Sequence, residues 1–254
     1  MTEPRANPDD APSHAIGNVV VSAIIPCLDE EQAIAIVVPA VLAQGVREVI
    51  VVDGGSRDRT VERATAAGAR VVVEPRRGYG RAVQAGVAAA RRDAEILLFI
   101  DGDGSDRTEF IAGLIAPLAQ RRAAFVQGSR VQGKRERGSL GPQQVAAGYV
   151  GGAMLRLLYG VRFTDLSPYR AIRRDAFERL GMRETTYGWN LEMLMRVAAA
   201  GLPALEIPVG QRRRIGGVSK VSGNLWAGVR AAWSIAATFV RLVLTLRREQ
   251  KRKA

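Results

Sequence analysis

Short runs of apolar residues, many of them β-branched, alternate with longer alanine-rich stretches along the first half of the chain. Five apolar runs predict strands that are buried on both faces: VVVSAII (19–25), EVIVVD (48–53), ARVVVE (69–74), EILLFID (95–101) and AAFVQGS (123–129). The stretches between them predict helices at 30–45, 57–68, 80–92 and 107–122. Strand–helix alternation at this spacing predicts an α/β fold with helices on both faces of a mostly parallel sheet.

The pattern changes after residue 130. A basic, glycine-rich segment (131–141) predicts a mobile loop, and the residues after it predict helices over 142–160 and around 187–201 and a strand over 202–209. A second basic loop, QRRRIGGVSK (211–220), precedes a long apolar segment (224–246). We therefore expect a disordered tail (1–18), one domain (19–222) with halves at 19–130 and 131–222, and a C-terminal amphipathic helix with a basic tail (223–254).

The C-terminal segment is too short to cross a membrane alone. Ten uncharged residues separate Arg230 from Arg241, whereas a spanning helix needs roughly 20. The two arginines are eleven positions apart, so they share one helix face while Trp233 and Val240 lie elsewhere around the helix. Such a helix either lies along a membrane surface, which the basic tail favours, or packs on its own domain or on a second subunit of a homo-oligomer.

The net charge and the rarity of cysteine and histidine narrow the range of possible functions. The formal net charge of +12 points to an anionic partner: nucleic acid, a phosphorylated substrate or an acidic membrane surface. Cys27 is the only cysteine and His14 the only histidine, which excludes an internal disulfide, a cysteine-built zinc site and a Ser-His-Asp triad. The N-terminal tail has no apolar core, so we expect no signal peptide and a cytoplasmic protein. No nucleic-acid-reading motif occurs, so nucleic acid is not an expected partner.

Three acid-bearing turns follow predicted strands: PCLDEE (26–31), VVDGGSRD (51–58) and IDGDGSD (100–106). In open α/β sheets, ligands bind beyond the carboxyl ends of the strands. We therefore expect the three turns to meet at one edge of the sheet and to form the functional site there.

The third turn has an unusual density of carboxylates. Asp101, Asp103 and Asp106 lie within six residues, where they repel one another unless a cation is among them. Asp101 and Asp103 suit a Mg²⁺ or Mn²⁺ ion shared with a diphosphate, and Gly102 lets the backbone approach closely. In addition, we expect Ser105 or Asp106 to cap the helix that follows, a role that would account for one acid but not for three.

Seven stretches of the chain occur in the order typical of family 2 glycosyltransferases: SAIIPCLDEE, VVDGGSRDRT, FIDGDGSD, VQGSR, TDLSPYRAIRRDAF, YGWNLEM and RRRIGGVSKVSGN. Over residues 19–224 the chain resembles the subgroup that contains the dolichyl-phosphate mannose synthases and related polyprenyl-phosphate glycosyltransferases. The resemblance implies the Rossmann-like fold called GT-A and an inverting, metal-dependent transfer of a hexose.

The implied donor is a nucleotide diphosphate sugar of the UDP-glucose or GDP-mannose type, and the implied acceptor is a polyprenyl phosphate. Such an enzyme would be peripheral at the inner, cytoplasmic face of the membrane. One alternative is the same donor chemistry on a soluble small molecule or a glycan chain. A more distant alternative is a basic nucleic-acid-binding module.

The resemblance also implies roles for individual residues. It places Pro26, Asp29 and Glu30 in the nucleotide pocket, Asp53 on the base or ribose, and Asp101, Gly102 and Asp103 on the donor, with Asp101 and Asp103 as metal ligands. It assigns four cations to the phosphates of donor or acceptor, namely Arg130, Arg212, Arg214 and Lys220. Arginine suits phosphate through its planar, bidentate geometry. For the arginines at 212–214 the alternative is a solvated basic surface.

Glu192, in YGWNLEM, matches a position where the family often carries an acid near the acceptor, so Asp103 and Glu192 are the expected catalytic residues. An acid that activates a hydroxyl acts as a general base. A phosphate monoester is already largely ionised at neutral pH, so with a lipid-phosphate acceptor Glu192 would orient groups instead. The alternative is that Glu192 pairs with a nearby arginine.

Overall fold

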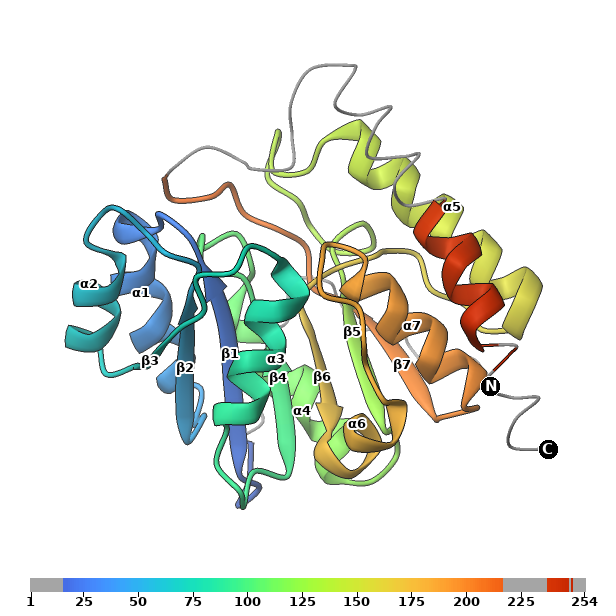
Figure 1. The fold of residues 1–254 in the computed structure, drawn as a ribbon, viewed down its shortest axis with the longest axis horizontal. Coiled ribbons are helices and arrows are strands. Elements are labelled where there is room, and N and C mark those ends of the chain that lie inside the picture. Colours follow the sequence, from blue (N-terminus) through green and yellow to red (C-terminus); the bar gives the residue numbers. More distant parts are fainter. Residues whose placement is uncertain (1–15, 217–236, 247, 249–254) are drawn as a thin grey trace.

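A mixed sheet of seven strands forms the centre of the computed structural model, which describes residues 16–216, 237–246 and 248 (Figure 1). The strand order is β3-β2-β1-β4-β6-β5-β7. The strands are β1 (Val21–Cys27), β2 (Glu48–Asp53), β3 (Arg70–Val73), β4 (Ile96–Phe99), β5 (Phe125–Ser129), β6 (Arg170–Arg173) and β7 (Ala204–Pro208). Three expected features lie wholly or partly outside the described residues: the tail at 1–15, Lys220, and the C-terminal segment at 223–236, 247 and 249–254.

The helices fall between these strands, and all but α6 lie where the sequence pattern predicts a helix. They are α1 (Glu31–Leu42), α2 (Thr60–Ala66), α3 (Tyr79–Ala89), α4 (Ile111–Ala119), α5 (Pro142–Tyr159), α6 (Arg174–Leu180) and α7 (Trp189–Ala199), with a 3₁₀ turn at Thr108–Phe110 before α4. Among the described residues, no helix has both the length and the apolar character that crossing a bilayer requires.

The first half of the sheet is parallel, as expected. β1 pairs in parallel with β2 and with β4, with Cys27 opposite Asp53 and Ile24 opposite Phe99. Because these strands run in the same direction, their carboxyl ends lie at one edge of the sheet, and the turns that follow them are brought together there.

β6 was not expected, and it is the strand that makes the sheet mixed. It pairs antiparallel with both β4 and β5, and so joins the halves 19–130 and 131–222 in one sheet. Its sequence, RAIR, has no apolar run, yet Arg170 is fully buried. The guanidinium of Arg170 donates hydrogen bonds to the carbonyls of Ser167 (Nε, 2.9 Å) and Asn190 (Nη1, 2.9 Å), which replace the water that burial removes.

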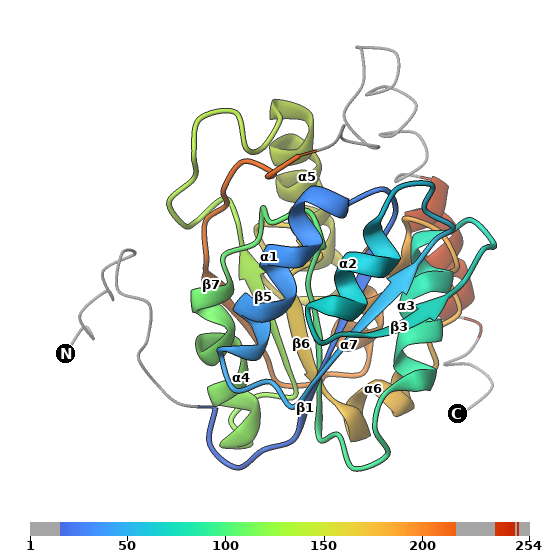
Figure 2. The ribbon, with the colours of Figure 1, turned by 90° about the vertical axis from the view of Figure 1, so that its left-hand side faces the viewer.

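Helices lie on both faces of the sheet (Figure 2), and two apolar clusters pack between them and the strands. One cluster includes buried residues of α1 and α4, and the other includes buried residues of α3, α5 and α7. Residues 237–246 form a helix whose Phe239, Leu242 and Leu246 belong to the second cluster, while Arg241 donates to Glu184. The described part of the C-terminal helix therefore packs on its own domain, which is one of the two alternatives for this segment.

Candidate active site

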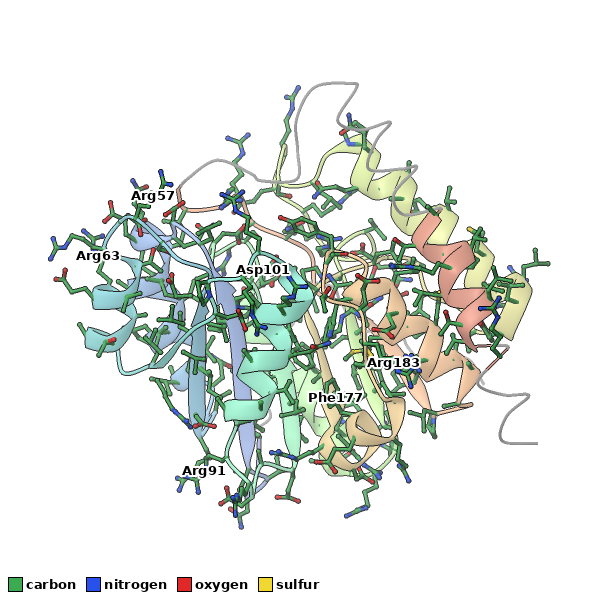
Figure 3. The ribbon with its side chains drawn as sticks, in the orientation of Figure 1. Arg57, Arg63, Arg91, Asp101, Phe177 and Arg183 are labelled. Carbon is green, nitrogen blue, oxygen red and sulfur yellow. The ribbon has the colours of Figure 1, made fainter. Side chains whose placement is uncertain are left out.

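The three acid-bearing turns meet at the carboxyl edge of the sheet, as predicted. The first two are joined directly: Asp29 N–H donates to Ser56 Oγ (2.9 Å), and Arg57 N–H donates to Asp29 Oδ1 (2.9 Å). The third turn follows β4, the other neighbour of β1. Figure 3 shows Asp101 at this edge and Arg91 at the opposite end of the sheet.

Asp53 shapes the second turn. Its carboxylate accepts hydrogen bonds from the backbone N–H groups of Gly55 (2.9 Å) and Ser56 (3.0 Å), and also from the Ser56 hydroxyl. The Asp53 side chain is almost completely buried. The oxygen atoms of Asp53 thus hold the turn that follows β2, the turn expected to face a nucleotide.

At Gly102 the backbone of the third turn passes directly against the end of β1. A Cβ atom at this position would lie 2.3 Å from Cys27 Sγ, so no larger residue fits against the end of β1. Asp103 Oδ1 accepts the N–H of Ser105 (2.9 Å), and Asp106 Oδ2 accepts the N–H of Asp101 (2.9 Å). The expected helix cap at Ser105 or Asp106 is wrong: the N-cap of the 3₁₀ turn is Arg107, which has no side-chain cap hydrogen bond. Asp106 instead closes its own turn.

Two carboxyl groups of this turn, those of Asp101 and Asp106, have raised pKa values. Burial raises the pKa of Asp101 well above its ordinary value, and the neighbouring Asp106 and Asp103 raise it further. Burial likewise raises the pKa of Asp106, to about 7. A cation placed between these groups would remove the repulsion, so the turn fits a cation chemically.

Arg214, near the C-terminal end of the domain's sequence, brings a positive charge to these carboxylates. Its Nη2 lies 2.5 Å from Glu30 Oε1, and its Nη1 lies 3.4 Å from Asp103 Oδ2. The segment that carries it crosses the third turn, because Arg212 N–H donates to the Ser105 carbonyl (2.9 Å) and Ile215 N–H donates to the Asp103 carbonyl (2.9 Å). Arg214 is therefore brought into the site as predicted.

Arg212 lies on the same segment but points elsewhere. Its Nη2 is 2.7 Å from Glu109 Oε1, and 48% of its side chain is exposed. The structure thus places Arg212 at the rim of the site, where its guanidinium is paired with Glu109. Lys220, the fourth expected cation, is outside the described residues.

The basic segment 131–141 was expected to be mobile, but the structure connects it to the segment that carries Arg214. The two form a parallel bridge between Arg135 and Gln211. Glu136 N–H donates to the Gln211 carbonyl (2.9 Å), and Arg213 N–H donates to Glu136 Oε2 (2.7 Å). The carboxylate of Glu136, within an otherwise basic run, gives the segment a fixed partner.

Arg130 is held by an acid that the sequence did not reveal as its partner. Asp165 accepts hydrogen bonds from Arg130 N–H (2.9 Å), Nε (2.8 Å) and Nη2 (2.8 Å), and both side chains are buried. Burial alone would raise the pKa of Asp165, but the hydrogen bonds and charge of Arg130 hold it below the ordinary value. The structure thus gives the Arg130 guanidinium a protein partner rather than an open phosphate-facing position.

Glu192 pairs with a nearby arginine, Arg196, as one of the two alternatives for this residue expected. Its side chain is 1% exposed and accepts hydrogen bonds from Arg196 Nε (2.8 Å) and from the backbone N–H groups of Arg183 (3.0 Å) and Glu184 (2.7 Å). These contacts hold the segment before α7 against the helix. In this structure both carboxylate oxygens of Glu192 are used to position that segment and Arg196.

An aromatic group that no sequence motif indicated lies beside Asp101 and Asp106. The Tyr79 ring stacks on Tyr187 at a centroid distance of 6.4 Å and meets the edge of Trp189 at 6.3 Å. Burial raises the pKa of the Tyr79 hydroxyl, and the charge of Asp101 raises it further. Trp189 Nε1 and Asn190 Oδ1 are buried without a hydrogen-bond partner in the part of the chain that the structure describes. In the sequence, the short motif GYG (78–80) was the only local indication of this aromatic group.

No group of three or more His, Cys, Asp or Glu side chains suited to a metal ion occurs within residues 16–216, 237–246 and 248. Asp101 and Asp103 alone could hold a divalent cation only with further ligands from a bound molecule or water. This donor set matches the mode in which Mg²⁺ takes one or two carboxylates and completes its shell with phosphate oxygens.

Comparison with known proteins gives relatives along most of the chain. Residues 22–181 match the family description Glycosyl transferase family 2. An uncharacterized glycosyltransferase of Mycobacterium tuberculosis is 40% identical over 212 residues, which cover 83% of this chain and 94% of that protein. A dolichyl-phosphate hexose transferase of Haloferax volcanii is 33% identical over 192 residues, which cover 74% of this chain and 81% of that protein.

Solved structures agree with these relatives. The crystal structure of glucosyl-3-phosphoglycerate synthase from Mycobacterium tuberculosis, in complex with Mn²⁺, uridine diphosphate and phosphoglyceric acid, matches with a TM-score of 0.67. The two chains are 26% identical, and the match covers 90% of this chain and 80% of the other. The predicted α/β architecture with the GT-A fold is confirmed, and so is the resemblance drawn from the seven motifs. This chain belongs to glycosyl transferase family 2 and is a glycosyltransferase.

Proposed function

We propose that the protein transfers a hexose from a nucleoside diphosphate sugar, of the UDP-glucose or GDP-mannose type, to a polyprenyl phosphate at the cytoplasmic face of a membrane. The observation that carries the donor half is the meeting of Asp101, Asp103 and Arg214 at the carboxyl edge of the sheet. Two carboxylates and a guanidinium are the groups needed to hold a diphosphate through a cation and through direct hydrogen bonds.

Asp101 and Asp103 hold Mg²⁺ or Mn²⁺ in this proposal. The raised pKa of Asp101, caused first by burial and then by the charges of Asp106 and Asp103, supports it. The Mn²⁺ bound with uridine diphosphate in the mycobacterial synthase structure supports it as well. When bound, the cation neutralises the charge that grows on the leaving diphosphate. In this scheme Pro26, Asp29, Glu30 and Asp53 line the nucleotide pocket, and Arg212, Arg214 and Lys220 supply charge to the phosphates.

The acceptor determines how much acid–base chemistry the protein must supply. A phosphate monoester is largely ionised at neutral pH, so its oxygen can attack the sugar carbon without a general base. The attack comes from the side opposite the diphosphate and inverts the anomeric centre. In this scheme Glu192 and Arg130 are positioning residues for the acceptor half (131–222) and do not touch the reacting atoms. Glu192 holds the backbone at 183–184 and Arg196, and Arg130 is held by Asp165. The 33% identity to a dolichyl-phosphate hexose transferase supports this acceptor class.

A second acceptor class has its own support. The synthase structure that matches this fold holds phosphoglyceric acid, a small phosphorylated molecule. The same donor chemistry on such an acceptor would need no membrane. In both cases the acceptor carries a phosphate, which agrees with the basic residues around the site.

The experiment is a transfer assay with radiolabelled UDP-glucose and GDP-mannose, with Mn²⁺ or Mg²⁺ present. Each donor is offered with a short-chain polyprenyl phosphate and, separately, with 3-phosphoglycerate. We expect label in the lipid phosphate, with Asp103→Asn inactive and Asp93→Asn, an exposed aspartate paired with Arg91, fully active. Label in phosphoglycerate alone would replace the lipid acceptor by the soluble one. No transfer from either donor would contradict the donor assignment.

A further inference from the structure

Helix α5 is mostly apolar on the side that faces away from the protein, where Arg156 is the exposed charged residue. Its most exposed residues include Tyr149 (56%), Val150 (60%) and Leu157 (85%). These positions lie at spacings of seven and eight residues, with the exposed Ala146 and Ala153 between turns, so they form one stripe along the helix. A helix at the surface of a globular domain ordinarily turns polar residues outward.

The inward side of the same helix is made of small residues. Gly148, Gly151 and Gly152 are buried, and a Cβ atom at Gly152 would lie 1.9 Å from the Phe163 carbonyl oxygen. The backbone of α5 must therefore stay close to the domain on this face. The helix cannot rotate to bury its larger apolar side chains, so the outward stripe is fixed by the packing of the glycines.

The sequence around the stripe is positively charged. Between Glu136 and Asp165 the chain has no acidic residue, and it carries Arg137, Arg156 and Arg162. A tyrosine among aliphatic residues and arginines is the composition found where a protein meets the interface of a bilayer. An anionic headgroup layer complements this charge, whereas the stripe itself complements the acyl region beneath it.

The C-terminal helix adds a second apolar row at the same end of the molecule. Val240 (57% exposed) and Leu244 (51% exposed) are one turn apart on the helix at 237–246. Figure 1 shows this helix and α5 together at the end of the molecule away from α1 and α2. α5 itself begins directly after segment 131–141, which is hydrogen-bonded to the segment that carries Arg214.

We propose that the outward stripe of α5, Tyr149–Val150–Ala153–Leu157, is a docking surface for an anionic lipid bilayer. The proposal rests on the proposed function, since a polyprenyl-phosphate acceptor lies in a membrane. Docking through α5 would hold the 131–141 segment, and with it the site, next to the lipid surface. The partner is the bilayer itself, bound through apolar insertion and headgroup charge.

The test is sedimentation of the full chain with vesicles of phosphatidylcholine and phosphatidylglycerol that contain no polyprenyl phosphate. The docking variant is Val150→Glu with Leu157→Glu. The matched control is Ile36→Glu with Val61→Glu, which makes the same change in charge at exposed positions of α1 and α2. Thermal stability, and the shift in it caused by nucleotide with Mn²⁺, are measured on all three proteins.

We expect the docking variant to bind the vesicles roughly tenfold more weakly than wild type, or worse, with the control within about twofold of wild type. Equal binding by both variants, or no binding of wild type, would overturn the proposal. A wild-type dimer that the docking variant converts to monomer would also overturn it, because the stripe would then cover a second copy of the chain. Vesicle binding without transfer to polyprenyl phosphate would instead contradict the proposed acceptor and leave the docking surface in place.

Discussion

Arg214 and Asp103 are 111 positions apart in the chain, yet Nη1 of the arginine lies 3.4 Å from Oδ2 of the aspartate, and its Nη2 lies 2.5 Å from Glu30. The guanidinium thus lies against Asp103, one of the two carboxylates that would hold the proposed metal ion. Its positive charge offsets part of the repulsion among the carboxylates. If a diphosphate and a cation bound here, Arg214 could exchange Asp103 for a phosphate oxygen, which would link metal binding to nucleotide binding.

Replacing Arg214 by alanine should affect metal and nucleotide in opposite directions. Without the guanidinium on Asp103, Mn²⁺ alone should bind roughly a few-fold more tightly, because it no longer displaces a positive charge. Nucleoside diphosphate with Mn²⁺ should bind about ten- to a hundredfold more weakly, because a charge-assisted hydrogen bond is lost. Calorimetric titration of Mn²⁺ with and without the nucleotide measures both effects.

Arg213→Ala is the matched control, since Arg213 Nε donates to the Arg137 carbonyl and its side chain contacts no carboxylate of the site. It should leave both affinities within about twofold of wild type, an effect expected of a change away from the ligand. If both variants weaken the nucleotide equally, the effect belongs to the basic surface as a whole rather than to Arg214.

Replacing Arg130 by alanine should destabilise the protein before any ligand is added. It leaves the Asp165 carboxylate buried without its partner, which costs about 3–5 kcal/mol. We expect a fall in Tm on the order of 10 °C by scanning calorimetry. Arg59→Ala, which removes the exposed pair with Glu62, should leave Tm nearly unchanged. A stable Arg130→Ala protein with impaired nucleotide affinity would show that Arg130 acts on phosphate.

The same pair predicts a pH dependence. Arg130 holds the pKa of Asp165 below its ordinary value, so the ionised carboxylate favours the folded state. This contribution is present above the unfolded pKa of about 3.9 and is lost as the pH falls through the lower folded value. The difference in Tm between wild type and Asp165→Asn should therefore be constant from neutral pH to about pH 5 and shrink below it. A difference that grows in acid would contradict the assignment.

Gly104→Ala should loosen the segment that carries Arg214. Gly104 has φ of +77°, and a Cβ atom there would lie 2.4 Å from Ile215 Cδ1. Gly160→Ala isolates the backbone cost, because Gly160 has φ of +72° with nothing within 4 Å of its Cβ position. We expect about 1–2 kcal/mol of destabilisation from Gly160→Ala, and a larger loss together with weaker nucleotide binding from Gly104→Ala. Equal losses and unchanged binding would show that the Ile215 contact is unimportant.

Much of the parallel sheet was predictable because its strands are buried on both faces. The strand predicted at 48–53 corresponds to β2, Glu48–Asp53, and the turns after β1, β2 and β4 meet where parallel strands require. β6 was missed because RAIR resembles a polar surface segment. Its burial depends on carbonyls at Ser167 and Asn190, which only the tertiary fold brings to Arg170.

The candidate site was predictable where one turn carries several acids, and less so where distant segments combine. Asp101, Asp103 and Arg214 were found from local motifs. The pairing of Arg130 with Asp165 was not predicted, because a sequence shows a charge but not its partner. An arginine partner for Glu192 was one of the two alternatives, but only the fold identifies it as Arg196. Tyr79 was missed because a lone aromatic in GYG is indistinguishable from an ordinary helix start.

The most direct test of the account is thermal stability with UDP, GDP and their hexose conjugates, each with and without Mn²⁺, on wild type, Asp103→Asn and the control Asp93→Asn. Ligand at a hundred times its Kd adds about 2.7 kcal/mol, which corresponds to a rise in Tm of roughly 5–10 °C. We predict such a rise for one nucleotide, dependent on Mn²⁺, present in the control and absent in Asp103→Asn. No rise with any nucleotide, or the same rise in Asp103→Asn, would contradict the assignment of this turn as the metal–diphosphate site.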